Sequence, residues 1–331
     1  MTTIGVLGSG SWGTALAFQL ARVNPKDSIY LWGHTPAKQQ KLIQDRCNAQ
    51  YFPDYPFPEN LVPVIELTEL LKKSECLVMA TPSYVFSDII EQIFKHSHNL
   101  PILSTVKGLS PDSAELLHTI VQSYAGSDYP FAVLSGPSFS TEVMAALPTA
   151  VTIASEQLQQ AEMWQRYFHS DYFRVYITDD IIGVQLGGAV KNVLAISTGI
   201  ADGLGFGANA RAALITRGLA EMMRLNQALG GKQTTMMGLA GVGDLVLTCT
   251  DNQSRNRRFG IALGSGKTVT EAQTEINRVV EGYQTTKLLH HLKLLHHIEM
   301  PICDAVYAIL FKNIPIPDVM QELLARSPKG E

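Results

Sequence analysis

The stretch TIGVLGSGSWG, residues 3–13, decides the fold of the amino-terminal half. Its first five residues form a short apolar run, which predicts a buried strand. Gly8, Gly10 and Gly13 then follow in the spacing G-x-G-x-x-G, and the next residues, TALAFQLARV, carry apolar side chains at helical intervals. A strand, this glycine turn and a helix make up the phosphate-binding unit of dinucleotide-binding folds. The sequence therefore predicts an α/β, Rossmann-like amino-terminal domain.

Each of the three glycines has a separate role in the predicted turn. Gly8 permits the tight turn, Gly10 lets the backbone approach a pyrophosphate, and Gly13 lets the helix pack close to the strand. The pyrophosphate then lies at the helix N-terminus, where free N–H groups and the helix dipole favour an anion. The alternative is a glycine-rich turn without a ligand, and the position between a strand and a helix argues against it.

Further apolar runs predict a doubly wound, mostly parallel sheet. Strands are expected over residues 28–33, 76–81, 101–106, 131–136, 150–155 and 173–178. In such a sheet the turns after the strands face the cofactor crevice, which is the usual place for ligands. Lys107 directly follows one of these strands, and this position favours a contact with a phosphate or a substrate oxygen over a surface role.

The end of the second strand bears on the choice of cofactor. NAD-specific folds of this type usually carry Asp or Glu there to hold the ribose 2′-hydroxyl. This sequence instead reads Gly33-His34-Thr35. Because no carboxylate repels a 2′-phosphate, we expect NADP(H) to be accepted as well as NAD(H), with His34 meeting that phosphate. The alternative is that His34 only lies near the adenosine.

From Asp179 onward the strand signals stop, and the pattern predicts an all-α second half. Helices are expected over residues 180–201, 208–229 and 281–298, with Asp179 or Asp180 as the first N-cap. The sequence thus predicts a dinucleotide-binding domain over residues 1–178 and a helical substrate and catalytic domain over residues 179–331.

One lysine lies at the middle of the first predicted helix, in the stretch LGGAVKNVLA, residues 186–195. Lys191 has apolar or small neighbours, so it either snorkels, with its ammonium in water, or exchanges a proton with a substrate oxygen. The second role requires that desolvation or a neighbouring cation lowers its pKa. Lysine side chains in helices lean over the preceding turn. There Gly187 and Gly188 are expected to leave space for ligand and ammonium together, which favours the second role.

Three other polar groups stand out in the second half. Asp244, in the glycine-flexed turn GVGDL, would orient and polarise the lysine, or cap the helix that follows. Ser254, Arg255 and Asn256 begin the basic run SRNRR, whose fork of donors suits a phosphate, although such a run also fits a solvated loop. Glu281, in VVEG, places one carboxylate before a helix.

Composition limits the remaining classes of protein. With 26 Lys+Arg against 30 Asp+Glu, the net charge is −4, so the chain lacks the excess of positive charge that is typical of nucleic-acid-binding proteins. No stretch approaches 18 uninterrupted apolar residues, so no transmembrane helix is expected, and the strand at Thr3 leaves no room for a signal peptide. The four cysteines are widely spaced, as in reduced cytosolic proteins. The histidines of HHLKLLHH, residues 290–297, form no convincing ligand set, so we expect no metal.

Taken in order, the motifs resemble a known family. GSGSWGTALA, VKGL, LSGPSF, GVQLGGAVKNVLAI, GLAGVGDLVLTCT, SRNRRFG and VVEG occur between residues 8 and 282. On these motifs the chain is similar to bacterial-type NAD(P)-dependent glycerol-3-phosphate dehydrogenases. The resemblance implies reversible NAD(P)H-dependent reduction of glycerone phosphate to sn-glycerol 3-phosphate, feeding glycerophospholipid synthesis. It also implies a homodimer.

The resemblance also implies roles for individual residues. Lys191 is the implied proton donor and acceptor, and the implied catalytic set is Lys191, Asp244 and Lys107. Implied substrate contacts are Lys107, Gly136, Ser138, Lys191, Asp244, Ser254, Arg255 and Asn256, with Arg255 and Asn256 gripping the phosphate. Implied cofactor contacts, beside Gly8, Gly10 and Gly13, are Ser11, Trp12, His34, Lys107, Ser140, Arg255, Val279 and Glu281. Ser140 departs from the usual Ala, and Ala208 stands where Asp is frequent.

Two other functions compete with this hypothesis. One is a related reductase of another small hydroxy compound, such as a β-hydroxyacid, against which the basic SRN element argues. The other is a non-catalytic NAD(P)-sensing module, which would need the glycine turn but not Lys191, Asp244 and Arg255.

Overall fold

The computed structural model describes residues 1–327, which divide into two compact units. The first unit comprises Met1–Val106 and Leu117–Val184, and the second comprises Lys107–Leu116 and the chain from Gln185 onward. The domain boundary predicted between residues 178 and 179 lies shortly before the division at Val184. The short segment that begins at Lys107 groups with the second unit, which the sequence did not indicate.

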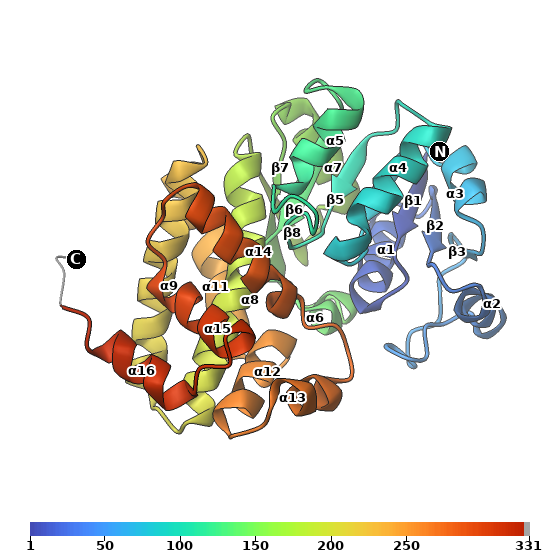
Figure 1. The fold of residues 1–331 in the computed structure, drawn as a ribbon. Coiled ribbons are helices and arrows are strands. Elements are labelled where there is room, and N and C mark those ends of the chain that lie inside the picture. The colour runs from blue at the N-terminus through green and yellow to red at the C-terminus, as the bar shows by residue number, and fades with distance from the viewer. Residues whose placement is uncertain (328–331) are drawn as a thin grey trace. The chain divides into compact units, whose positions relative to one another are not determined.

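The first unit contains an eight-stranded sheet in the order β3-β2-β1-β4-β5-β6-β7-β8 (Figure 1). Neighbouring strands are parallel except for β6 and β7, which are antiparallel. The predicted doubly wound, mostly parallel sheet is therefore confirmed. Its strands are β1 (Thr3–Leu7), β2 (Ser28–Trp32), β3 (Leu61–Val64), β4 (Cys76–Met79), β5 (Ile102–Ser104), β6 (Phe131–Ser135), β7 (Thr149–Ala154) and β8 (Phe173–Thr178).

Strand β3 was not expected from the sequence. It contains Pro63, and a proline cannot donate to the hydrogen-bond ladder, which argues against a central strand. The structure places β3 at the edge of the sheet, where, among the residues described, it pairs with β2 alone and sets Pro63 beside Leu31. An edge strand needs partners on one side alone, so the proline is tolerated there.

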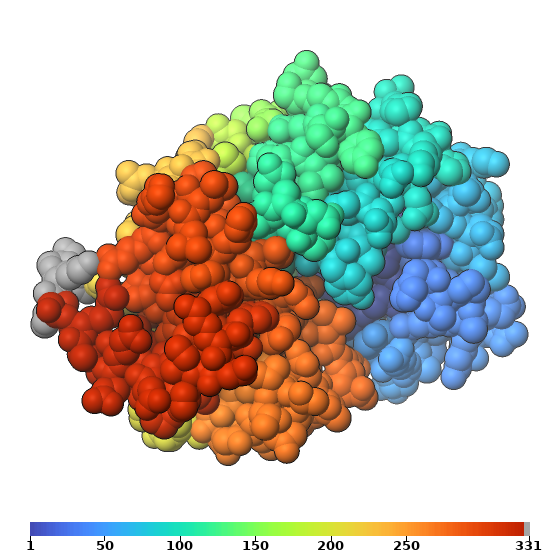
Figure 2. Space-filling model, in the orientation of Figure 1, coloured from blue at the N-terminus to red at the C-terminus, as the bar shows by residue number. Residues whose placement is uncertain are grey.

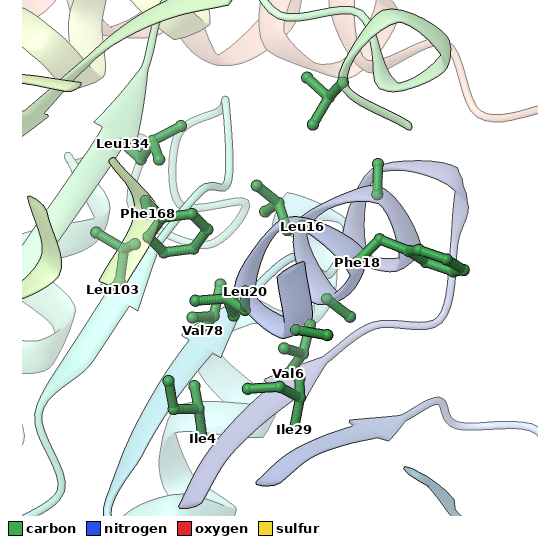
Figure 3. Close-up of a cluster of buried hydrophobic side chains, with 14 of the residues drawn as sticks. Ile4, Val6, Leu16, Phe18, Leu20, Ile29, Val78, Leu103, Leu134 and Phe168 are labelled. Atoms are coloured by element: carbon green, nitrogen blue, oxygen red, sulfur yellow. The ribbon is translucent and has the colours of Figure 1, made fainter. Parts of the chain in front are cut away.

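Helices cover both faces of this sheet. Ile4 and Val6 of β1 point to the face covered by α1, with Leu16 and Leu20 above them (Figure 3). Gly5 points to the opposite face, where a Cβ would lie 2.5 Å from the Leu70 side chain. The helices of the first unit are α1 (Ser11–Val23), α2 (Pro36–Asp45), α3 (Leu67–Lys73), η1 (Ser83–Val85), α4 (Phe86–His96), α5 (Leu117–Ala125), α6 (Ser140–Met144) and α7 (Leu158–Phe168).

The core beneath α1 fixes that helix on the sheet. Ile4, Val6, Leu16, Leu20 and Ile29 are all fully buried. Burying an aliphatic side chain of this size stabilises a fold by roughly 1.5–3 kcal/mol. This packing holds the N-terminus of α1 directly beyond the carboxyl end of β1, where a phosphate site requires it.

The second unit is helical, as predicted. Its first long helix, α8 (Ile181–Gly203), begins in the last residues of the first unit and continues into the second. Asp180 is confirmed as the N-cap of α8, since its Oδ1 accepts a hydrogen bond from the Gly183 N–H at 2.9 Å. In Figure 2, the residues of α12 to α16, coloured orange to red, lie next to one another on the visible surface. The elements are α8 (Ile181–Gly203), α9 (Ala208–Ala228), α10 (Gln233–Met236), the π-helical turn η2 (Leu239–Gly243), α11 (Asp244–Thr250), α12 (Arg255–Gly264), α13 (Val269–Ile276), α14 (Glu281–Leu295), α15 (Pro301–Phe311) and α16 (Ile316–Leu324).

Helix α8 is long and apolar enough to cross a membrane by length and composition. It is the one such helix within residues 1–327, and 89% of its most apolar window is buried inside the structure. A core helix of a globular protein has the same properties, and burial on this scale is typical of one.

Candidate active site

In the glycine turn of the first unit, Gly8 and Gly13 lie close against other backbone atoms, whereas Gly10 borders open space. Gly8 has a φ of +119°, and a Cβ there would lie 2.5 Å from the carbonyl oxygen of Ala80. A Cβ at Gly13 would lie 1.8 Å from the carbonyl oxygen of Gly8. At Gly10, in contrast, an added Cβ would meet no atom within 4 Å. Gly10 therefore presents open backbone, the surface that a pyrophosphate needs.

Helix α1 begins at this open backbone. Its N-cap, Gly10, offers no side chain, so no side-chain cap occupies the first N–H groups of the helix. Beside them, the hydroxyl oxygens of Ser11 and Ser140 are 2.6 Å apart, and Trp12 Nε1 donates to Thr105 Oγ1 at 3.0 Å. An uncapped helix N-terminus with hydroxyls around it suits an anionic phosphate.

Two buried hydroxyls at the same edge of the sheet support a ligand site. Thr81 Oγ1 and Ser135 Oγ have no hydrogen-bond partner within residues 1–327. Thr81 lies just beyond β4 and Ser135 ends β6, so both are at the carboxyl edge of the sheet. Buried polar atoms are normally paired. These hydroxyls and the open Gly10 backbone fit a dinucleotide with many polar atoms.

The other predicted residues of the first unit lie at this carboxyl edge as well. His34 is exposed just beyond β2, with its Nε2 3.1 Å from Thr35 Oγ1. Gly136, with a φ of +136°, follows β6, and Ser138 Oγ donates to the Gly136 carbonyl oxygen at 2.9 Å. The carboxyl ends of parallel strands share one edge, which explains why these separate turns gather there.

In the second unit, one buried carboxylate holds two lysines. Lys107 Nζ donates to Asp244 Oδ2 at 2.7 Å, and Lys191 Nζ donates to Asp244 Oδ1. The side chain of Asp244 is 1% exposed and that of Lys191 is 8% exposed. The suggestion that Lys191 snorkels into water is therefore wrong. So is the suggestion that Asp244 caps α11, since Asp244 lies inside the first turn and its carboxylate binds the lysines instead.

Thr248 belongs to this cluster and was missed in the sequence. Its Oγ1 accepts a hydrogen bond from Lys191 Nζ at 2.9 Å and donates to the carbonyl oxygen of Asp244 at 2.6 Å. Thr248 follows Asp244 by four residues in α11, so both side chains lie on one face of the helix. That spacing in DLVLT was the available signal, but it has meaning only once Asp244 is known to meet Lys191.

The cluster shifts the pKa of both buried partners. Burial lowers the pKa of Lys191 to about 8; Asp244 opposes this shift, and the positive charge of Lys107 reinforces it. Burial by itself would raise the pKa of Asp244, but the two lysines outweigh burial and hold it below its usual value. Asp244 is therefore ionised near neutral pH, whereas Lys191 can exchange its proton there.

The space beside Gly187 is not left for a ligand, and the prediction is wrong for this residue. A Cβ at Gly187 would lie 2.1 Å from the carbonyl oxygen of Ala240. The missing side chain thus lets η2 pack directly on the α8 backbone. Since Asp244 immediately follows η2, this close contact brings its carboxylate to the Lys191 ammonium.

Two asparagines connect the lysine helix to α12 and α14. Asn256 Nδ2 donates to Asn192 Oδ1 at 2.8 Å, and Asn256 Oδ1 accepts from the Gly282 N–H at 2.9 Å. Asn192 Nδ2 donates to the Lys107 carbonyl oxygen at 3.4 Å. The predicted residues Lys107, Asn256 and Glu281, the neighbour of Gly282, therefore belong to one region of the second unit.

The basic run SRNRR forms the first turn of a helix rather than a solvated loop. Ser254 is the N-cap of α12, and its side chain accepts from the Arg257 N–H at 3.2 Å. Arg255 is half-buried and donates to the carbonyl oxygen of Val279 at 2.9 Å. Asn256 is buried, whereas Arg258 is exposed.

The predicted site residues thus form two groups, one in each unit. The first unit holds Gly8, Gly10, Ser11, Trp12, Gly13, His34, Gly136, Ser138 and Ser140, and the second holds Lys107, Lys191, Asp244, Ser254, Arg255, Asn256, Val279 and Glu281. Within residues 1–327 no group of three or more His, Cys, Asp or Glu side chains could hold a metal ion.

Comparison with known proteins agrees with both halves of this arrangement. Residues 3–161 match the family model described as "NAD-dependent glycerol-3-phosphate dehydrogenase N-terminus", and residues 180–321 match that of the corresponding C-terminus. A protein of Tolumonas auensis named glycerol-3-phosphate dehydrogenase [NAD(P)+] is 48% identical over 330 residues, 99% of this chain and 98% of its own. One of the same name from Actinobacillus pleuropneumoniae serotype 5b is 50% identical over 98% of this chain and 97% of its own.

A solved structure is also closely similar. The crystal structure of glycerol-3-phosphate dehydrogenase from Coxiella burnetii superimposes with a TM-score of 0.94 at 47% identity, covering 98% of this chain and 99% of that one.

Proposed function

The chain belongs to the NAD-dependent glycerol-3-phosphate dehydrogenase family, and on this basis we propose that it reduces glycerone phosphate to sn-glycerol 3-phosphate, reversibly, with NAD(P)H. The observation that carries the proposal is the buried cluster of Lys107, Asp244 and Lys191. Burying two ammonium groups and a carboxylate is costly. A module that only senses NAD(P) has no use for such a cluster.

Lys191 is the proton donor in reduction and the acceptor in oxidation. An ammonium has three N–H donors, and Asp244 and Thr248 take two of those of Lys191. We assign the third to the substrate's C2 oxygen. Bound NAD(P)H supplies the hydride to C2. Because burial brings the pKa of Lys191 to about 8, the proton can move in either direction near neutral pH.

Asp244 and Lys107 support this proton transfer. Two lysines keep Asp244 ionised, so it does not take the proton from Lys191 but fixes the direction of the ammonium. We propose that Lys107 contacts the substrate and the cofactor as well, since its side chain remains 16% exposed.

The substrate phosphate binds, in this proposal, at the first turn of α12. Arg255 supplies a half-exposed guanidinium there, and Ser254 and Asn256 flank it. Planar guanidinium groups suit phosphate oxygens. Gly136 and Ser138 of the first unit are proposed to contact the same substrate.

The cofactor binds at the carboxyl edge of the sheet. We propose that its pyrophosphate lies over Gly8, Gly10 and Gly13 at the N-terminus of α1, with His34 near the adenosine ribose. Since no acid follows β2, both NADP(H) and NAD(H) fit. The further contacts proposed are Ser11, Trp12, Lys107, Ser140, Arg255, Val279 and Glu281.

We further propose a homodimer that works in the cytoplasm in glycerophospholipid synthesis, with a dinucleotide-binding domain over residues 1–178 and a helical catalytic domain over 179–331. The net charge of −4 argues against a nucleic-acid partner. The burial of α8 argues against membrane insertion. Light scattering on the purified protein tests the dimer.

One assay tests the proposed activity. Purified protein is mixed with NADPH or NADH, and absorbance is followed after glycerone phosphate or unphosphorylated glycerone is added. We expect oxidation of the cofactor with the phosphorylated substrate and far slower oxidation without the phosphate. Equal rates with both substrates would favour a reductase of another small hydroxy compound, and no rate with either would favour the sensing module.

A further inference from the structure

One arginine of the SRNRR run is turned away from its neighbours and buried. Arg257 Nε donates to the carbonyl oxygen of Cys249 at 3.1 Å. One NH1 hydrogen bond goes to Asn252 Oδ1, and NH2 donates to Asp202 Oδ2 at 2.5 Å. These acceptors lie at the end of α11, in the loop before α12 and at the end of α8. A single guanidinium therefore joins three segments of the second unit.

Asp202 is itself held in place. Arg211 of α9 donates to both of its carboxylate oxygens, from Nε at 3.0 and 3.1 Å and from NH2 at 2.7 Å. The side chains of Arg257 and Asp202 are 8% and 9% exposed. Charged side chains this deeply buried are almost always paired, and a fork of donors that meets fixed acceptors is rigid.

Arg257 points to a different side of α12 from Arg255, one of the residues proposed to bind the substrate phosphate. Successive residues of a helix are rotated by about 100°, so Arg255 points away from the side on which Arg257 is anchored. Arg255 is half-buried and reaches Val279. Asn256, between them, points to Asn192 of α8.

The backbone of the same turn also lies against α8. A Cβ at Gly199 would be 2.2 Å from the Arg257 carbonyl oxygen, and a Cβ at Gly260 would be 2.2 Å from the Ile196 carbonyl oxygen. Glycines on both helices thus permit direct backbone contact. At this backbone contact, the orientation of α12 relative to α8 depends on the side chains that anchor the first turn of α12.

We propose that Arg257 is a positioning residue for phosphate recognition: it fixes the first turn of α12 on α8, and thereby the place of Arg255 and Asn256 relative to Lys191. This inference rests on the proposed function, because it assumes that Arg255 and Asn256 bind a phosphate. Arg257 itself touches no substrate. Its loss should therefore weaken binding of the phosphorylated end of the substrate and leave the proton transfer at Lys191 intact.

The test is Arg257→Lys, which keeps the charge but cannot reach three acceptors in different directions. Steady-state rates are measured at saturating NADPH with glycerone phosphate and with glycerone. We expect the KM for glycerone phosphate to rise about tenfold or more. This is the size of effect expected when displaced Arg255 and Asn256 lose hydrogen bonds to the charged phosphate. The kcat, and the kcat/KM for glycerone, should stay nearly unchanged.

The matched control is Arg258→Lys, the same exchange at the exposed neighbour, which should behave as wild type. Asn252→Ala removes one of the three acceptors of Arg257, at an exposed residue, and should raise the KM for glycerone phosphate to a smaller degree. This variant tests the proposal if Arg257→Lys does not fold. The proposal is overturned if the Arg257 variant matches the control, if glycerone loses rate equally, or if Asn252→Ala leaves KM unchanged. An inactive wild type would instead refute the proposed function.

Discussion

Lys107 donates a 2.7 Å hydrogen bond to the carboxylate of Asp244, although 137 residues separate them in the chain. The other oxygen of that carboxylate accepts from Lys191. With both lysines protonated the cluster carries one net positive charge, which is lost when Lys191 releases its proton. Since buried net charge is costly, this arrangement favours release from Lys191 near neutral pH.

Replacing Lys191 with Ala should lower kcat for reduction by about 10²–10⁴-fold, the usual contribution of a general acid. NADPH should still bind, because the glycine turn of the first unit is unchanged. NADPH absorbance measures the rate, and quenching of NADPH fluorescence measures binding. Lys287→Ala, at an exposed position on α14, is the control. Near wild-type turnover in the Lys191 variant would refute its assigned role.

The pH dependence of kcat should follow Lys191. Reduction needs the ammonium, so its rate should fall as pH rises through about 8, whereas oxidation needs the neutral amine and should rise there. Lys107→Gln removes a positive charge that lowers this pKa and should move both transitions to higher pH. Asp244→Asn removes a negative charge that raises it and should move them to lower pH. Shifts of the two variants in the same direction would contradict this electrostatic account.

Gly10→Ala should lower stability by no more than about 1 kcal/mol, the usual cost of Ala at an N-cap, and still weaken NADPH binding. The added Cβ meets no atom of the chain within 4 Å, and Gly10 has an ordinary φ of −75°. A bound pyrophosphate would need that space. Gly13→Ala is the contrasting variant, since its Cβ would lie 1.8 Å from the Gly8 carbonyl oxygen, and it should lower Tm. Unchanged NADPH affinity in Gly10→Ala would exclude the proposed cofactor position.

Glu221 should make stability depend on pH. Its carboxylate accepts from the Ile302 N–H at 2.7 Å and the Cys303 N–H at 3.2 Å, and burial raises its pKa from 4.5 to about 7. Between these values the folded state binds more protons than the unfolded state, so stability falls as pH rises, by up to about 3 kcal/mol. Glu221→Gln should remove this dependence.

Denaturant unfolding at both ends of that pH window measures the effect. Glu322→Gln, at an exposed position on α16, should leave the wild-type dependence in place. If the free energy of unfolding changed with pH by the same amount in wild type and in Glu221→Gln, Glu221 would not titrate in this window.

Gly199→Ala should destabilise the second unit by about 1–3 kcal/mol, as expected for overpacking. Its Cβ would lie 2.2 Å from the Arg257 carbonyl oxygen, so α8 and α12 must separate. Gly207→Ser is the control, because a Cβ there meets nothing within 4 Å and Ser is favoured at an N-cap such as that of α9. A Gly199 variant as stable as this control would show that the two helices separate without cost.

The fold was largely predictable because its signals are local. The run TIGVLGSGSWG identifies a strand, a turn and a helix from neighbouring residues alone, and the later apolar runs add the strands of a parallel sheet. The failure at β3 has a local cause too. Pro63 argues against a strand, and only the position of β3 at the sheet edge makes the proline acceptable.

The candidate site was predictable in its members but not in their relations. Lys191 and Asp244 stood out as charges in apolar surroundings, yet Thr248 did not, because a threonine in an apolar helix has no such contrast. The sequence predicts ligand space beside Gly187, whereas in the structure the Ala240 backbone occupies that space.

By itself, the sequence determined which face of its own strand or helix each residue occupies, since that follows from the period of the element. Only the tertiary structure decided which faces meet. It joined Asp244 to Lys107 and Lys191 across 137 and 53 residues of chain, and it buried Arg257 while leaving Arg258 exposed. Pairings of this kind depend on how whole elements pack, and no local pattern of residues encodes that packing.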